Sequence, residues 1–253
     1  MITRRQTLGI LGMAAAFPWV TFAESKPASK KKGWCGDDAS LHELFRASWY
    51  YSWQPTTSSS STMEFVPMIK SEHNIESIPR IGEATEGSAL LGFNEPEQET
   101  QGNVTLERAL ELWPQLVAFA EKRNLRLGSP APSSNGKGMK WFEAFMDEAN
   151  RRKLRVDFIA MHWYRSRSAA DFEGFIKDLT RKYRRPIWIT EFNGWSGPEK
   201  ENYDFLKGTL RFMERASSNV ERYAYFNPHP GEPHSLLNLD GSLTRMGELY
   251  RDT

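Results

Sequence analysis

Short apolar runs alternate along this chain with longer stretches in which apolar side chains recur every three or four residues. The short runs are β-prone and bounded by turn residues, a pattern that predicts buried strands. The longer stretches have the spacing of amphipathic helices. We expect strands at residues 46–49, 64–68, 90–93, 126–128, 156–161, 186–190 and 223–226, and helices at 106–123, 140–152, 170–183, 203–216 and 243–251.

The first long helix carries two local signals. Thr105 precedes its first apolar position and can cap the free N–H groups of the first turn. Pro114 lies in its middle and lacks a backbone N–H, so we expect the helix to kink or divide there.

The alternation of strands and helices predicts a parallel α/β fold. Seven strands over roughly 210 residues favour a small closed (β/α)₈ barrel over an open sheet. The weak segment 76–81 is the candidate for a vestigial third strand, which gives a reduced third β/α unit. A doubly wound sheet is the alternative, but no Gly-rich phosphate loop follows the predicted first strand.

The N-terminal segment has the layout of an export signal. Residues 1–23 begin with Arg4 and Arg5, continue with an apolar stretch and end in a small-x-Ala pattern at Ala23. The Thr3-Arg4-Arg5 run is similar to the twin-arginine type of signal. We expect residues 24–33 to form a flexible linker with solvated lysines, and residues 34–253 to form one catalytic domain. No other apolar run is long enough to span a bilayer.

The composition narrows the classes of partner. The 253 residues include 33 Lys and Arg against 32 Asp and Glu, a balance that argues against nucleic acid or an anionic membrane as the main partner. One cysteine, Cys35, excludes an intramolecular disulfide and is expected as a free, partly buried thiol. The high aromatic fraction, 13% with 9 Trp, supplies flat faces suited to sugar ligands as well as core volume.

Two glutamates follow apolar runs, each after one intervening polar residue. Glu95 stands in Leu-Leu-Gly-Phe-Asn-Glu-Pro at 90–96, and Glu191 stands in Ile-Trp-Ile-Thr-Glu at 187–191. A carboxylate at the end of a buried strand is costly without a partner or a task. If both strands are parallel, both carboxylates face the same rim, where barrel enzymes place their catalytic groups. Glycosidic cleavage needs such a pair, one to protonate the leaving oxygen and one to attack the anomeric carbon or activate a water.

Polar and aromatic residues near these strand ends are candidates to bind the substrate. His162 or Tyr164 could hydrogen-bond the ionised glutamate, and alternation places both opposite Trp163. Aromatic faces can stack on sugar rings, and amide groups can hydrogen-bond sugar hydroxyls. The expected substrate-binding residues are Asn94, His162, Trp163, Tyr164, Trp49, Tyr50, Trp53, Asn193 and Trp195.

Metal and cofactor signals are weak. His229 and His234 lie in a Pro- and Gly-rich loop that could clip a metal, but no further ligands with a recognisable spacing accompany them. A loop that forms one wall of the cleft is the preferred interpretation. The sequence contains no G-x-S-x-G elbow, Walker loop or H-E-x-x-H helix. We expect neither a metal nor an organic cofactor.

Six segments occur in a fixed order along the chain. They are Ser-Trp-Tyr-Tyr-Ser-Trp at 48–53, Glu-Phe-Val-Pro-Met at 64–68, Leu-Gly-Phe-Asn-Glu-Pro at 91–96, Gly-Ser-Pro at 128–130, His-Trp-Tyr at 162–164 and Pro-Ile-Trp-Ile-Thr-Glu-Phe at 186–192. Together they resemble glycoside hydrolase family 128, a family of small (β/α)₈ barrels that act on β-1,3-glucans. The resemblance covers roughly residues 33–250, nearly the whole chain beyond the expected signal.

The resemblance implies roles for the two glutamates. Glu95, at the end of the fourth strand, would be the general acid/base, and Glu191, at the end of the seventh, the nucleophile. The implied reaction retains configuration through a covalent intermediate, with the carboxyl groups about 5–5.5 Å apart. The expected protein is a monomeric, periplasmic or secreted endo-β-1,3-glucanase.

Three alternatives remain open from the residues. One is an endoglycanase of the same barrel clan that cuts another β-linked polysaccharide. Another is a barrel that binds β-glucan oligosaccharides with little turnover, and the third is a cell-wall interaction protein with a structural barrel. Subgroups of the resembled family differ in endo and exo action, so the mode of cleavage stays open as well.

Overall fold

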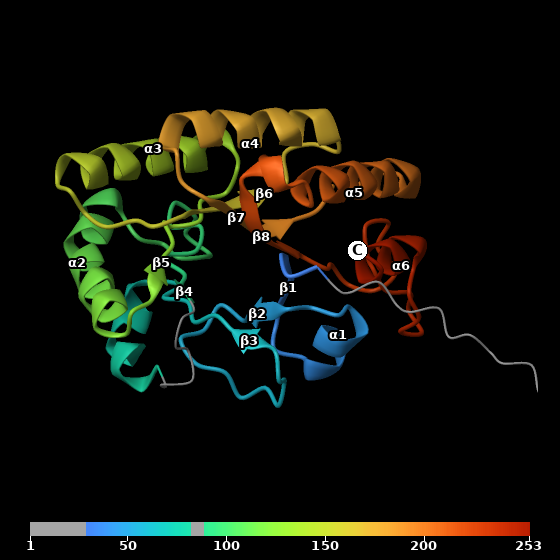
Figure 1. Cartoon of the computed structure of the whole chain (residues 1–253), viewed down its shortest axis with the longest axis horizontal. Helices are drawn as coiled ribbons and strands as arrows, with labels where there is room; N and C mark the ends of the chain where they lie inside the picture. Colours follow the sequence, from blue (N-terminus) through green and yellow to red (C-terminus); the bar gives the residue numbers. More distant parts are fainter. Residues whose placement is uncertain (1–28, 82–88) are drawn as a thin grey trace, which may run out of the picture.

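The structure is a computed structural model that describes residues 29–81 and 89–253, so the expected export signal lies outside the described residues. Strands alternate with helices, and α2, α3, α4 and α5 lie around the strands (Figure 1). The strands are β1 Lys32–Cys35, β2 Trp49–Tyr51, β3 Glu64–Phe65, β4 Ala89–Leu90, β5 Arg126–Leu127, β6 Ile159–Trp163, β7 Ile187–Phe192 and β8 Val220–Tyr225. The helices are α1 Ala39–Leu44, α2 Leu106–Lys122, α3 Gly136–Arg151, α4 Ala169–Tyr183, α5 Glu199–Met213 and α6 Arg245–Arg251, with 3₁₀ helices η1 Glu72–Arg80 and η3 Ala216–Ser218.

All strand pairs in the two sheets are parallel. Six strands pair in the order β3-β2-β1-β8-β7-β6, and β4 pairs with β5. Single parallel bridges join the two sheets, from Met68 to Leu91 beyond β3 and β4, and from Gly128 to Phe158 between β5 and β6. The described strands therefore follow one another around a ring in chain order. The predicted parallel α/β fold is confirmed.

The interior of the ring is filled by alternate residues of the strands. Trp49 and Tyr51 of β2 and Trp188 of β7 belong to one buried cluster with Phe158. The Trp49 indole lies against Gly33 of β1, where a Cβ atom would come within 2.3 Å of the indole ring. The absence of a side chain at Gly33 thus makes room for the indole inside the ring.

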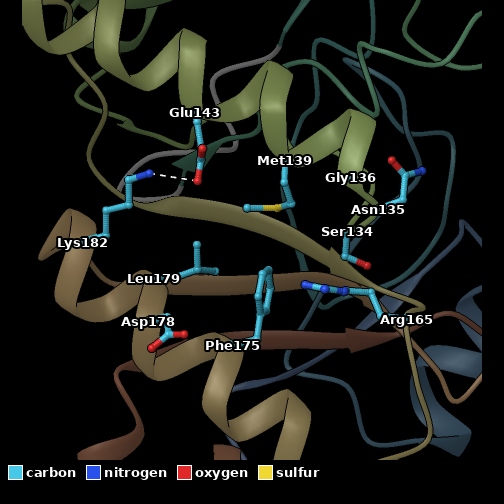
Figure 2. A pocket seen from close by; sticks show the side chains of 10 residues that line it. All are labelled: Ser134, Asn135, Gly136, Met139, Glu143, Arg165, Phe175, Asp178, Leu179 and Lys182. Carbon is cyan, nitrogen blue, oxygen red and sulfur yellow. Dashed lines mark ion pairs between the residues drawn. The ribbon is translucent and has the colours of Figure 1, made fainter.

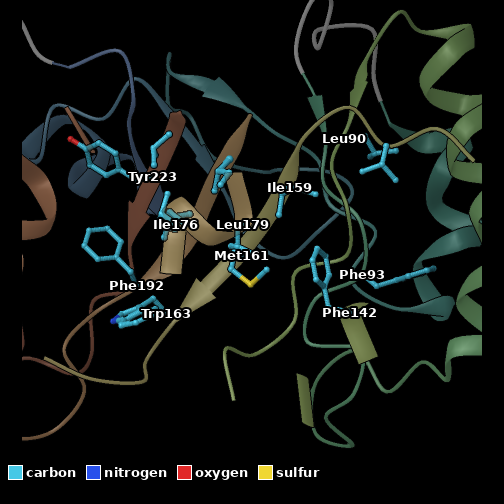
Figure 3. Close-up of a cluster of buried hydrophobic side chains, with 14 of the residues drawn as sticks. Leu90, Phe93, Phe142, Ile159, Met161, Trp163, Ile176, Leu179, Phe192 and Tyr223 are labelled. Atoms are coloured by element: carbon cyan, nitrogen blue, oxygen red, sulfur yellow. The ribbon is translucent and has the colours of Figure 1, made fainter. Parts of the chain in front are cut away.

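A larger apolar layer lies between the strands and the helices. Figure 3 shows Ile159 and Met161 of β6 near Phe142 of α3 and Ile176 of α4. All four side chains are fully buried, and burial of each contributes about 1.5–3 kcal/mol to folding. This layer explains the three- and four-residue spacing of apolar positions in the helices, because each helix presents one face to the strands.

The helix α2 begins as predicted but is not divided. The Thr105 side chain accepts a hydrogen bond from the Arg108 N–H and caps the first turn. The expected division at Pro114 is wrong, because α2 runs as a single helix from Leu106 to Lys122. The buried side chains of Trp113 and Leu116, on either side of the proline, hold both halves against the core.

The first strand was not predicted. β1 begins at Lys32, inside the segment 24–33 for which we expected a flexible linker with solvated lysines. Lys32 is fully buried, and its ammonium group donates to the carbonyl oxygens of Tyr250 and Arg251 at 2.9 and 2.8 Å. These carbonyls lie at the C-terminal end of α6, where a cation is favoured. The expectation of a solvated side chain is therefore wrong for Lys32.

The predicted third strand is also wrong. Residues 76–80 belong to η1, which follows β3 and replaces an α-helix in the third unit. Ile75, Ile78 and Ile81 recur every three residues, which is the period of a 3₁₀ helix rather than of a strand. The true third strand is β3, which we counted as the second because β1 was missed. The two errors cancel, so β4 and β7 keep their predicted positions in the order.

Among the residues that the structure describes, no helix has both the length and the apolar character needed to cross a membrane.

Candidate active site

The two predicted carboxylates meet at one buried histidine. His162, near the end of β6, has its Nδ1 2.9 Å from Glu95 Oε1 and its Nε2 3.4 Å from Glu191 Oε1. The imidazole is fully buried, whereas the Glu95 side chain is 14% exposed. Parallel strands therefore bring residues 95, 162 and 191 to the same end of the ring.

A β-bulge directs Glu191 into this site. Along β7, Trp188 belongs to the interior cluster and Ile189 to the outer layer, so strict alternation would turn Glu191 outward. The register with β8 shifts between Ile189 and Phe192, and Phe192 packs in the outer layer. The extra residue reverses the alternation, which is the usual effect of a bulge beside an active site. Glu191 is consequently buried among polar partners at the rim.

Glu95 is aimed by an unusual backbone conformation. Its φ angle is +39°, which lies in the left-handed region that few non-glycine residues adopt. The Glu95 N–H donates to the Ala131 carbonyl oxygen at 2.7 Å, and Asn94 forms a bridge with the same residue. Surrounding contacts therefore hold a conformation that costs energy, as is common at functional sites.

Three side chains donate hydrogen bonds to Glu191. The Trp53 indole N–H donates to Oε1 at 2.8 Å, the Tyr51 hydroxyl to Oε1 at 3.1 Å, and the Tyr164 hydroxyl to Oε2 at 2.6 Å. The donors come from β2, the loop after β2 and the residue after β6. Together they fix both carboxylate oxygens in one orientation.

The surroundings shift the proton affinities of these neighbours. Burial works to lower the pKa of His162, but the Glu191 charge and the hydrogen bond and charge of Glu95 outweigh it, so the pKa is raised. Burial, followed by the Glu191 charge, raises the pKa of Tyr164 well above its usual value. Burial also raises the pKa of Tyr51, with added contributions from Cys35 and Glu191. Both tyrosines therefore remain protonated donors at neutral pH.

Cys35 contacts the backbone of Thr190, the residue before Glu191. Its thiol lies 3.2 Å from the Thr190 carbonyl oxygen. The Tyr51 hydroxyl lies 3.0 Å from the same carbonyl oxygen, so its single proton is shared between this oxygen and Glu191 Oε1. Burial and the Glu191 charge raise the pKa of the Cys35 thiol well above its usual value. The side chain is half-buried and free, as expected, and its protonated thiol supports the strand that carries Glu191.

The carboxylates open into a cleft of about 420 Å³. Trp195 is 57% exposed at its edge and has a φ of +59°, which turns the indole toward the cleft wall formed with Tyr164. An exposed indole beside two carboxylates suits the CH face of a sugar ring. The cleft is lined by Glu95, Gln98, Gln101, Ser133, Ser134, Asn135, Tyr164, Arg165, Glu191, Trp195 and Phe226.

Three aromatic residues that we expected to bind substrate lie elsewhere. Trp49 fills the ring interior, and its indole N–H donates to the Lys31 carbonyl oxygen at 3.0 Å. Tyr50 belongs to the outer layer, with its hydroxyl 3.1 Å from Thr57 Oγ1. Trp163 packs against Phe172 and Phe175 of α4. All three side chains are at most 2% exposed and face away from the cleft. The expectation that they bind substrate is therefore wrong.

The two predicted asparagines are buried. Asn193 donates to the Phe226 carbonyl oxygen at 3.0 Å and accepts from the Trp195 N–H at 2.8 Å, so its amide supports the loop of Trp195. The expectation that Asn193 contacts the substrate directly is therefore wrong. Asn94 is 2% exposed, and its Oδ1 has no partner among the described residues.

Sequence reasoning missed a buried clamp beside the site. Glu97 Oε1 accepts from the Ser133 N–H at 3.1 Å and from the Ser133 hydroxyl, and Gln98 donates to the same hydroxyl at 3.3 Å. The next residue, Ser134, accepts from the Tyr164 N–H at 3.2 Å. The loops after β4, β5 and β6 are thereby tied together. Glu97 follows the Asn-Glu-Pro motif by one residue, and no local signal distinguished it from a solvated carboxylate.

The histidine loop takes no part in the cleft lining. Phe226 directly precedes this loop and lines the cleft, whereas neither His229 nor His234 does so. His234 is buried, and burial lowers its pKa. Within residues 29–81 and 89–253, no cluster of three or more His, Cys, Asp or Glu side chains could hold a metal ion.

Comparisons with known proteins agree with this geometry. The family model described as "Glycosyl hydrolase catalytic core" matches residues 30–250. Alkali-sensitive linkage protein 1 of Schizosaccharomyces pombe is 32% identical over 219 residues, which cover 80% of this chain and 39% of that protein. The chain thus spans well under half the length of this relative.

Solved structures are similar over nearly their full length. A subgroup I endo-β-1,3-glucanase of glycoside hydrolase family 128 from Amycolatopsis mediterranei, in complex with laminarihexaose, is 30% identical with a TM-score of 0.76, covering 88% of this chain and 99% of that one. A subgroup III curdlan-specific exo-β-1,3-glucanase from Blastomyces gilchristii, in complex with glucose, is 32% identical with a TM-score of 0.75, covering 89% and 99%.

Proposed function

The chain belongs to glycoside hydrolase family 128, and on that premise we propose that it is an exported endo-β-1,3-glucanase that retains anomeric configuration. The observation that carries the proposal is the placement of Glu95 and Glu191 on either side of His162 at the mouth of one cleft. The substrate class is supported by the complexes of similar glucanases with laminari-oligosaccharides.

In the first step, Glu191 attacks the anomeric carbon of a glucosyl unit. Glu95 gives its proton to the glycosidic oxygen as the carbon–oxygen bond breaks, so the departing chain leaves with a neutral hydroxyl. The result is a glucosyl ester on Glu191. The donors Trp53, Tyr51 and Tyr164 orient the attacking carboxylate, which lowers the cost of reaching the transition state.

In the second step, water replaces the departed chain. Glu95, now ionised, removes a proton from the water, and the hydroxyl oxygen attacks the anomeric carbon. The ester bond to Glu191 breaks, and both carboxyl groups return to their starting states. Two inversions at the same carbon give net retention. We expect the carboxyl groups to lie about 5–5.5 Å apart in the complex with substrate.

The cleft supports endo action. Its lining includes Trp195, Ser134, Asn135 and Arg165 in addition to the two carboxylates, so the cleft offers contacts to more than the glucosyl unit at the scissile bond. The exo-acting relative from Blastomyces gilchristii makes release of single glucose units the second candidate. If the protein instead cuts a different β-linked polysaccharide, or binds β-glucan without turnover, β-1,3-glucan would remain intact in the assay.

The cellular setting is part of the proposal. The Arg-Arg start, the apolar stretch and Ala23 support export to the periplasm or medium by the twin-arginine route. We also propose that the mature protein is a monomer and that no nucleic acid binds to it, in keeping with its near-zero net charge.

The proposal is tested by reducing-sugar release from a linear β-1,3-glucan, with cellulose and mannan derivatives in parallel and Glu191→Ala as the control. Short oligosaccharides of several lengths, released from the β-1,3-glucan alone and absent with the variant, are the expected result. Glucose as the sole early product would identify an exo enzyme. No release from any polymer would contradict the assignment as a hydrolase.

A further inference from the structure

A second pocket adjoins the cleft between α3 and α4. It has a volume of about 300 Å³ and shares Ser134, Asn135 and Arg165 with the cleft. Figure 2 shows the pocket between the two helices, with Ser134 and Asn135 at one end and Lys182 at the other. Its volume is at the lower end of the range for ligand sites, roughly 300–1,000 Å³.

The lining of this pocket suits a neutral sugar. Phe175, Met139 and Leu179 contribute apolar surface, against which the CH groups of a sugar ring can pack. Lys182 and Glu143 form an ion pair of 2.9 Å across the pocket, and both side chains are nearly half exposed. They present a donor and an acceptor to hydroxyl groups, as the pocket's other polar residues do.

The charges in the lining oppose an ionic ligand. Lys182 and Arg165 are balanced by Glu143 and Asp178, so no excess of either sign remains for an anion or a cation. The guanidinium of Arg165 lies over the Phe175 ring at 5.6 Å from its centroid, on the boundary between pocket and cleft. Arg165 can therefore contact a chain that passes from the cleft into the pocket.

The position of the pocket relative to Glu95 gives the direction of that chain. A general acid lies next to the leaving oxygen, so the departing segment begins on the Glu95 side of the cleft. Gln98, three residues after Glu95, donates to the Ser133 hydroxyl at 3.3 Å, and both residues line the cleft. The next two residues, Ser134 and Asn135, line both the cleft and the pocket.

We propose that the pocket between α3 and α4 is an accessory subsite that binds a glucosyl unit of the departing segment of a β-1,3-glucan. The inference rests on the proposed function and deepens it. A chain too short to extend beyond Arg165 does not reach the subsite, whereas a longer chain gains the additional contacts. The enzyme therefore prefers substrates with several units on the leaving side of the cleaved bond.

The test removes the polar contacts without touching the cleft. The double variant Glu143→Ala/Lys182→Ala deletes an exposed ion pair, whose loss costs little stability. The matched control is Glu173→Ala/Lys177→Ala, which deletes an exposed ion pair of 2.7 Å on α4 outside the pocket lining. Initial rates are measured for each protein on laminari-oligosaccharides of increasing length, and the products are sized to locate the cleaved bond.

The expected result is a fall in kcat/KM of roughly threefold to tenfold on the longest oligosaccharides, the scale of one or two lost hydrogen bonds. Rates on the shortest cleaved oligosaccharide, and all rates of the control variant, should equal those of the unmodified enzyme. The accessory subsite is refuted if the double variant keeps the unmodified enzyme's ratio of long-chain to short-chain rates. If the unmodified enzyme cleaves no β-1,3-glucan of any length, the proposed function itself fails.

Discussion

His162 Nδ1 lies 2.9 Å from Glu95 Oε1, and the other ring nitrogen faces Glu191. A single buried imidazole therefore contacts both carboxyl groups, and its protonation state alters the charge that each of them experiences. In the proposed reaction one carboxyl group must be protonated while the other is ionised. The His162 imidazole, which contacts both, can favour this unequal distribution of protons.

The role of Glu95 as proton donor predicts a dependence on the leaving group. In Glu95→Gln, hydrolysis of β-1,3-glucan should fall about 10²–10⁴-fold, the usual contribution of a general acid. An aryl β-glucoside with an acidic phenol needs no proton to leave, so formation of the intermediate should be nearly normal and visible as a burst of phenol in stopped-flow absorbance. Glu191→Gln should show no burst on the same substrate. Equal losses on both substrates would contradict the assignment of Glu95.

The raised pKa of His162 predicts a pH-dependent contribution to stability. A group whose folded pKa is raised stabilises the protein fully below its unfolded pKa, near 6.5, and loses that contribution as pH rises through the folded value. The difference in unfolding free energy between the unmodified protein and His162→Gln should therefore shrink above pH 6.5. Urea denaturation of both proteins from pH 5.5 to 8.5 measures it. A difference that is constant, or that grows with pH, would contradict the raised pKa.

Orientation of Glu191 by Tyr164 predicts a selective loss of turnover. In Tyr164→Phe the hydrogen bond of 2.6 Å to Oε2 is removed and the ring remains. We expect kcat to fall about tenfold, with the thermal midpoint within a few degrees of the unmodified protein. Steady-state kinetics on a long laminari-oligosaccharide provide the measurement. Tyr50→Phe is the matched control, since its hydroxyl contacts Thr57 away from the cleft and its removal should leave kcat unchanged.

The clamp of Glu97 on Ser133 predicts a loss of stability together with activity. Glu97→Ala leaves the buried Ser133 N–H and hydroxyl without this acceptor, which should lower the unfolding free energy by about 1–3 kcal/mol. Glu97→Gln keeps an acceptor oxygen and should recover much of both properties. Chemical denaturation and kcat on β-1,3-glucan test the pair of variants. Full stability of Glu97→Ala would show that the clamp contributes nothing.

Local sequence alone was enough to place Glu95 and Glu191 at strand ends. Apolar runs bounded by turn residues define strands through side-chain burial, and burial depends mainly on the residues of the run itself. Helices α2 to α6 were predicted for the same reason, because their apolar faces repeat with the helical period. The missed β1 contains a lysine whose ammonium group donates to carbonyl oxygens at the end of α6, 218 and 219 residues away in the chain.

The faces of the aromatic residues were partly readable. Alternation already turned Trp163 away from His162 and Tyr164, and the structure confirms that direction. A position near the end of a strand did not by itself show whether a side chain faces the cleft, because neighbouring strand residues point to opposite faces. Tyr51 shares a face with Trp53 by the same alternation, and this signal could have identified it as a partner of Glu191.

The sequence by itself determined the parallel α/β class, helices α2 to α6 and the two carboxylates of the site, since each follows from local patterns of polarity. Only the tertiary structure decided that Glu191 points inward, because the bulge in β7 reverses a strict alternation that the residues of that strand would otherwise follow. It also decided the clamp of Glu97 and the pocket between α3 and α4. Each of these depends on side chains from different units of the ring, and their separation in space is fixed by packing rather than by any local pattern.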